Sequence, residues 1–218
     1  METVKKNVFE ILNNAFSVGF KARYENVFEQ YYPAHNSTGF TERNLTCNFA
    51  EALAKDLGND SFVWYEAPLP ITPEGKYPHV DAVVFSKKLN SIFLIEAKRF
   101  GDKPSGKIKS IKKDLVRLLE LDNDDIVKKK STNREHLLKE WGWKEKDKTN
   151  QPMSEYVICL ADYWGENTAK VEKLLENLRV ELEIAHNCNG KVNKIGKFDD
   201  TTCLINYNIF IVFFEIQQ

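Results

Sequence analysis

The chain has few of the residues that mark a secreted, zinc-bound or membrane-spanning protein. Its 218 residues include four cysteines, and no two of them stand at the close spacing of a zinc site. The longest apolar run covers positions 209–214, which is far too short to span a bilayer. The N-terminus also lacks the long apolar core and the small-residue cleavage site of a signal peptide. We therefore expect a cytoplasmic protein with reduced, mostly buried thiols and no membrane partner.

An excess of charge of one sign is missing as well. The formal net charge is −1 at pH 7, which excludes a uniformly basic coat for nucleic acid, so any binding to DNA or RNA must use local patches. Hydrophobic residues make up 42% of the chain, which excludes a disordered protein. Length and composition together predict a single domain over residues 1–218 with a substantial core.

Apolar periodicity predicts an order of helices and strands. Helical spacing over 3–17 and 21–31 indicates an N-terminal helical appendage that covers 1–40. The next helix is expected between Thr41, a good N-cap, and Gly58, a good helix terminator. Strands are expected at 61–67, 79–85, 91–100 and 155–162, and helices at 106–121 and 166–186. The chain then continues into a final strand or hairpin at 203–216.

The predicted fold class is α/β. The central strands are apolar on both sides, which is typical of a sheet that helices cover on both faces. Residues 122–152 are polar and charged, and we interpret them as a charged insertion in this domain. Trp141 and Trp143 lie in this insertion, where they could stack on bases or anchor the segment to the core.

The strongest chemical signal lies at the end of the strand expected at 91–100. Side chains alternate along a strand, so Glu96 and Lys98 share one face of it. Asp81 has the matching parity in the preceding strand, and a short antiparallel pairing would bring it beside Glu96. Two buried carboxylates repel each other, and a divalent cation such as Mg²⁺ relieves both the burial and the repulsion. With the lysine to orient or deprotonate a metal-bound water, these residue types suit phosphodiester hydrolysis.

Asp81 followed by Glu96-Ala97-Lys98 resembles the PD-(D/E)xK nuclease superfamily, also called restriction-endonuclease-like. The resemblance extends over residues 41–162 and implies an αβββαβ core with a mixed sheet. It implies that Asp81, Glu96 and the backbone carbonyl of Ala97 bind Mg²⁺ or Mn²⁺ and that Lys98 serves the attacking water.

The resemblance also implies a glutamate from the first helix of the core. Glu42 suits this role because it lies three residues before the core-facing Leu45, whereas Glu51 is expected to face outward. Glu66 is a further carboxylate that could approach the metal. DNA is the implied partner, in restriction, defence or repair, and a homodimer is an option because palindromic sites mirror two-fold symmetry. The family also has members that lost catalysis, so a binding module is the alternative.

A second motif lies directly behind the first. Gly101 and the pair Gly106-Lys107 follow a strand and open a helix, as in a phosphate-binding loop of nucleotide hydrolases. Position 108 is isoleucine, however, where such a loop needs serine or threonine for Mg²⁺. A nucleotide hydrolase is therefore the weaker alternative. The lysines of this stretch form a basic patch that could attract a phosphate backbone, namely Lys103, Lys107, Lys109, Lys112 and Lys113.

Overall fold

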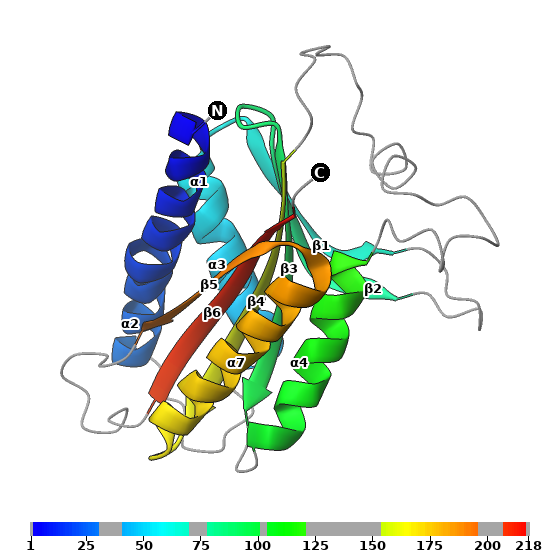
Figure 1. Cartoon of the computed structure of the whole chain (residues 1–218). Coiled ribbons are helices and arrows are strands. Elements are labelled where there is room, and N and C mark those ends of the chain that lie inside the picture. The colour runs from blue at the N-terminus through cyan, green and yellow to red at the C-terminus, as the bar shows by residue number, and fades with distance from the viewer. Residues whose placement is uncertain are drawn as a thin grey trace.

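The computed structural model describes residues 2–30, 41–69, 78–100, 104–120, 154–195 and 207–216. A six-stranded sheet with the order β1-β2-β3-β4-β6-β5 forms its centre (Figure 1). The strands are β1 (Ser61–Pro68), β2 (His79–Ser86), β3 (Ser91–Phe100), β4 (Ser154–Trp164), β5 (Asn189–Ile195) and β6 (Tyr207–Ile216). The β3–β4 pair is parallel and all other pairs are antiparallel, so the sheet is mixed.

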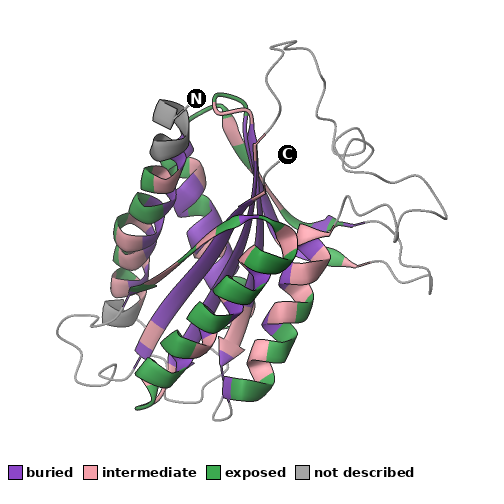
Figure 2. Cartoon of the chain, in the orientation of Figure 1, coloured by how far each residue is buried: buried purple, intermediate pink, exposed green. Residues whose placement is uncertain are grey.

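Helices cover both faces of this sheet (Figure 1). One face carries the helices α1 (Glu2–Asn14), α2 (Lys21–Gln30) and α3 (Glu42–Leu57), with a π-helical turn, η1 (Ala15–Phe20), between the first two. The other face carries α4 (Pro104–Leu119) and α7 (Thr168–His186). Figure 2 shows buried strands between helices whose outer sides are exposed. The predicted α/β class, with a mixed sheet between two helical layers, is confirmed.

The alternation of side chains along the strands divides the core in two. In β3, Phe93, Ile95 and Ala97 pack on the α1–α3 side. Ile92 and Leu94 pack on the α4–α7 side. Glu96 and Lys98 continue the second row, so the strand directs them towards α4.

The N-terminal helices are part of the first core. Leu12, Phe16 and Phe20 are fully buried there against the sheet and α3. Helix α1 also reaches the last strands of the chain, because the ring of Phe9 lies 5.4 Å from that of Phe213 in β6. Lys191 of β5 lies 4.6 Å above the same Phe9 ring. These contacts make residues 2–30 a layer of the domain rather than an addition to it.

The fold differs from the sequence predictions at one edge strand and at the bounds of several elements. The edge strand β5 was not predicted, because its apolar residues Val192 and Ile195 stand three positions apart and not two. Helix α4 begins at Pro104, two residues before its predicted start. The predicted charged insertion lies outside the described residues. Of the helices that the structure describes, none is both long and apolar enough to cross a membrane.

Candidate active site

The predicted pair of carboxylates meets where β2 and β3 stop pairing. Ala82 pairs with Ile95, so the next step along the two strands brings Asp81 opposite Glu96. The register between β1 and β2 likewise puts Glu66 opposite Asp81. Three carboxylates therefore lie across three neighbouring strands, at the ends next to the start of α3.

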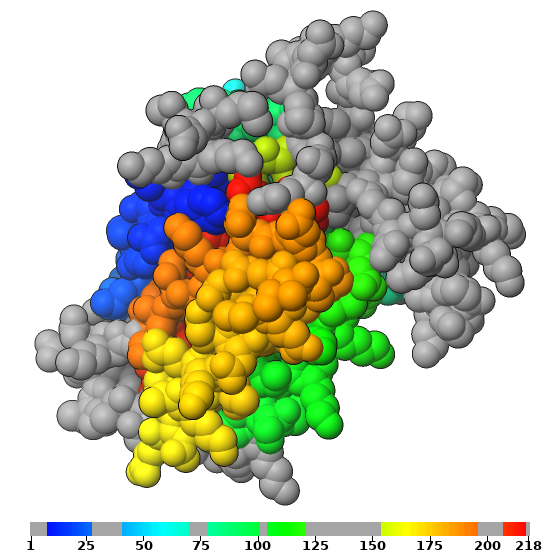
Figure 3. Space-filling view, in the orientation of Figure 1, coloured from blue at the N-terminus to red at the C-terminus, as the bar shows by residue number. Residues whose placement is uncertain are grey.

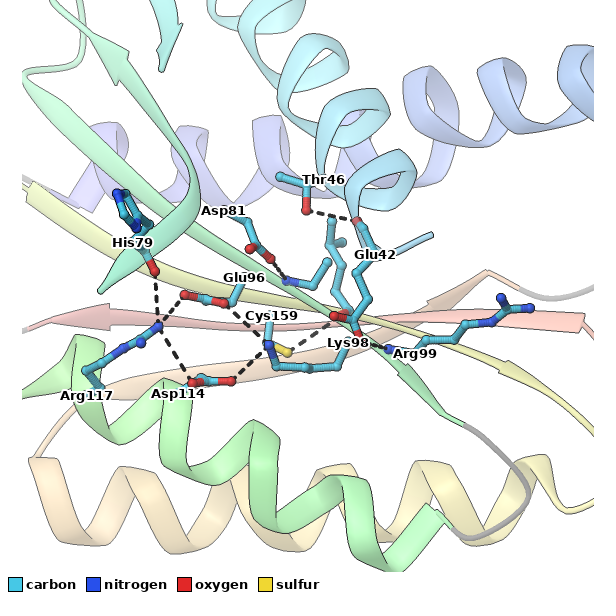
Figure 4. Close-up of polar contacts among 12 residues, drawn as sticks. Glu42, Thr46, His79, Asp81, Glu96, Lys98, Arg99, Asp114, Arg117 and Cys159 are labelled. Atoms are coloured by element: carbon cyan, nitrogen blue, oxygen red, sulfur yellow. Dashed lines mark hydrogen bonds and ion pairs between the residues drawn. The ribbon is translucent and has the colours of Figure 1, made fainter. Parts of the chain in front are cut away.

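Asp81 is tied to the backbone of β3. Its Oδ2 atom accepts a hydrogen bond of 2.8 Å from the Ala97 amide (Figure 4). In an extended strand, the N–H and C=O groups of one residue point to the same neighbouring strand, so the Ala97 carbonyl also faces Asp81. Burial raises the pKa of Asp81, although the Ala97 amide and the Lys98 charge oppose this rise. The aspartate and the carbonyl that the family resemblance names are thus neighbours.

Glu96 and Lys98 belong to a closed ring of ion pairs with two residues of α4 (Figure 4). Arg117 Nη2 lies 2.6 Å from Glu96 Oε1. Lys98 Nζ lies 3.6 Å from Glu96 Oε2 and 3.0 Å from Asp114 Oδ2. Asp114 Oδ1 closes the ring at 3.6 Å from Arg117 Nη2. Each carboxylate lies between two cations, and each cation between two carboxylates.

Glu96 and Lys98 both have shifted pKa values. Glu96 is only 3% exposed, and this burial together with the charge of Asp81 raises its pKa, while the ring cations Arg117 and Lys98 oppose the rise. Burial by itself would lower the pKa of Lys98, but the hydrogen bond and charge of Asp114, with Glu96 and Glu42, raise it above its ordinary value. Lys98 is therefore a firmly protonated cation at neutral pH.

Glu42 reaches the same end of β3 from the first turn of α3. Its Oε1 atom accepts a hydrogen bond of 2.9 Å from the Arg99 amide and lies 3.8 Å from Lys107 Nζ. The other two candidate glutamates are engaged at the surface. Glu51 faces outward as predicted and pairs with Arg23 at 2.5 Å. Glu66 pairs with Arg43 at 3.2 Å.

The basic residues of α4 divide between two environments. Lys109 and Lys113 are exposed on the outer side of the helix. Lys112 pairs with Glu181 of α7, which lies beside α4 on the face shown in Figure 3. Lys107 is half-buried next to Glu42. Lys103 lies outside the described residues.

Asp114 and Arg117 were not predicted as site residues. A signal was present, because Asp114 stands within the apolar stripe of α4 formed by Ile111, Leu115 and Leu118. An acid in such a stripe needs a partner inside the protein. That partner, Lys98, comes from another element, so helical periodicity alone does not identify it.

The residues that would form a phosphate-binding loop are arranged differently. Gly106 and Lys107 lie inside α4, and Ile108 packs against the core between this helix and the sheet. Asp162 of β4 is 1% exposed and accepts a hydrogen bond of 3.1 Å from the Tyr207 hydroxyl, so this acid is engaged within the core. Arg99 Nε lies 3.8 Å from the same Asp162 oxygen.

The donor types near Asp81 suit a hard cation. Two carboxylates with raised pKa values and one backbone carbonyl are oxygen ligands of the kind that Mg²⁺ and Mn²⁺ take. Within the described ranges, no three or more His, Cys, Asp or Glu side chains are already arranged to hold a metal. The Glu96 oxygens face Arg117 and Lys98 instead. The oxygen donors therefore fit a metal only if the Arg117 side chain moves away from Glu96.

Comparison with known proteins gave no match to a protein-family model, to a curated protein or to a solved structure at a significant level. The geometry of the site therefore carries the functional conclusion.

Proposed function

We propose that the chain is a metal-dependent nuclease of the PD-(D/E)xK superfamily that hydrolyses DNA phosphodiester bonds. The hydrogen bond between Asp81 and the Ala97 amide is the observation that carries this proposal, because it joins the aspartate to the strand of Glu96 and Lys98. The order α3, β1, β2, β3, α4, β4 also agrees with the αβββαβ core of that superfamily.

The residues divide the chemistry between them. Asp81, Glu96 and the Ala97 carbonyl would hold Mg²⁺ or Mn²⁺, which supplies an activated water and stabilises charge on the phosphate. Asp114 holds the Lys98 ammonium at 3.0 Å, and the raised pKa of Lys98 keeps it protonated. Lys98 therefore acts as a charged donor that orients the water and the phosphate, rather than as a base. Glu42 lies at the edge of the site, where its hydrogen bond to the Arg99 amide holds it, and it would be a further carboxylate ligand for the metal.

A binding module without catalysis is the second candidate, and one observation favours it. The ring of Glu96, Lys98, Asp114 and Arg117 satisfies its own charges without a metal. A ring that needs no metal is what we would expect of a protein with this fold that binds DNA without cleaving it.

Cleavage of supercoiled plasmid at low salt separates the two candidates. We expect the wild type to nick plasmid with Mg²⁺ or Mn²⁺, and both a chelator and Asp81→Asn to abolish nicking, because each removes the metal. Asp60→Asn, at an exposed aspartate in the turn before β1, is the control. DNA binding without nicking by the wild type would favour the binding module. Equal nicking by wild type and Asp81→Asn would contradict this active centre.

The exposed lysines of α4 are expected to contact the DNA backbone. Changing Lys109 and Lys113 to alanine should weaken DNA binding and reduce the slope of log K against log salt by about 2, since each phosphate contact on duplex DNA contributes about 0.9. Lys87 and Lys88 are the matched control pair, because they are exposed in the turn at the other end of β3. Equal slopes for the two double variants would locate the DNA surface elsewhere.

A further inference from the structure

Arg117 has the position of a cation at the candidate metal site. Its Nη2 atom lies 2.6 Å from Glu96 Oε1, closer than the 3.6 Å between Lys98 Nζ and Glu96 Oε2. Glu96 is 3% exposed, so few other positive groups can approach it. A divalent ion that used Glu96 would therefore lie beside a guanidinium, and the two positive charges would repel each other.

The polar groups of Arg117 are not all well bonded, so its side chain can move at low cost. Its Nε atom is buried and has no hydrogen-bond partner among the described residues. Its bond to the His79 carbonyl is long, at 3.4 Å. The side chain is 34% exposed, so it has an open side towards solvent. Burying an arginine N–H without a partner is unfavourable, and a shift of the side chain would relieve this cost.

A second acceptor lies next to the present one. Asp114, one turn earlier on α4, has its Oδ1 atom 3.6 Å from Arg117 Nη2. A small rotation would move the guanidinium from Glu96 to Asp114 without leaving it unpaired. Asp114 and Arg117 stand three residues apart on the same helix, so the acceptor stays within reach of the guanidinium when a metal binds at β3.

We propose that Arg117 competes with the divalent ion for Glu96. In the metal-free protein Arg117 neutralises the Glu96 carboxylate, and its side chain must move towards Asp114 before the metal binds. The inference rests on the proposed nuclease function. It assigns Arg117 a control of metal affinity, and the displaced guanidinium would become a donor for the phosphodiester substrate.

Binding of Mn²⁺ alone, without DNA, tests the competition, with the free ion measured by electron paramagnetic resonance. We expect Arg117→Gln to bind Mn²⁺ at least about tenfold more tightly than the wild type, because a repelling charge next to the ion is removed. Arg117→Met is the second variant if the glutamine variant does not fold. Arg179→Gln is the matched control, since Arg179 is a helical arginine of α7 paired with Glu176 and Glu183, and it should leave the affinity unchanged.

Asp81→Asn distinguishes failure of this inference from failure of the proposed function. If Mn²⁺ binding depends on Asp81 but is equal or weaker in the Arg117 variants, the metal site stands and the competitor role is wrong. If no variant shows binding that depends on Asp81, the metal site is wrong and the competitor role is wrong with it.

Discussion

Replacing Lys98 with methionine is expected to lower the rate of Mg²⁺-dependent plasmid nicking by roughly 10²–10³-fold, the usual cost of removing one hydrogen-bond donor to a developing oxyanion. Methionine keeps the unbranched apolar stem and removes the ammonium. The stem is half-buried beside Glu96, so the fold should survive, and thermal unfolding would show this.

The role of Lys98 separates from that of the metal ligands by a binding measurement. Lys98→Met should still bind Mn²⁺ with an affinity that depends on Asp81, because the lysine contributes no ligand. Lys87→Met is the control, since Lys87 is an exposed lysine in the turn at the other end of β3. A nicking rate within about twofold of the wild type in Lys98→Met would remove Lys98 from the chemistry, because the loss of one charged donor costs far more than that.

Replacing Asp162 with asparagine is expected to change how the stability of the protein depends on pH. Burial, opposed by Arg99 and by the Tyr207 hydrogen bond, raises the pKa of Asp162 from its ordinary value of 3.8 to about 7. A raised pKa means that the folded state binds the proton more tightly than the unfolded state. The aspartate therefore costs least below pH 4, and the cost grows as the pH rises through the range from about 4 to 7.

Asparagine cannot ionise, so it escapes this cost. The free energy of unfolding of Asp162→Asn relative to the wild type should rise between pH 4 and pH 8 by an amount on the order of 4 kcal/mol, from the rise in pKa and 1.36 kcal/mol per pH unit. Urea unfolding at several pH values measures this difference. A difference that stays flat with pH for Asp162→Asn would contradict the raised pKa.

The parts of the site that could be predicted are those within reach of strand periodicity. Asp81, Glu96 and Lys98 have matching parity in neighbouring apolar strands, and the register brings them together. The prediction for Glu42 came instead from the resemblance to the nuclease superfamily, which implies a glutamate on the first helix of the core. Its hydrogen bond to the Arg99 amide places this glutamate near the end of β3.

To predict the α4 partners of Glu96 and Lys98 would have required tertiary information. Asp114 and Arg117 come from α4, and the rotation of a helix above a sheet depends on packing that periodicity alone does not fix. The edge strand β5 shows a different limit. An edge strand buries little surface, so its sequence carries a weak apolar pattern.

The contact between α1 and β6 has a consequence for synthesis of the chain. Phe9 and Phe213 are far apart in the sequence, yet their rings lie 5.4 Å apart in the folded protein. At about 5 to 20 residues per second, roughly 10 to 40 seconds separate the synthesis of these two residues. Throughout that time Phe9 lacks this partner, so the contact between α1 and β6 can form only after β6 has been made.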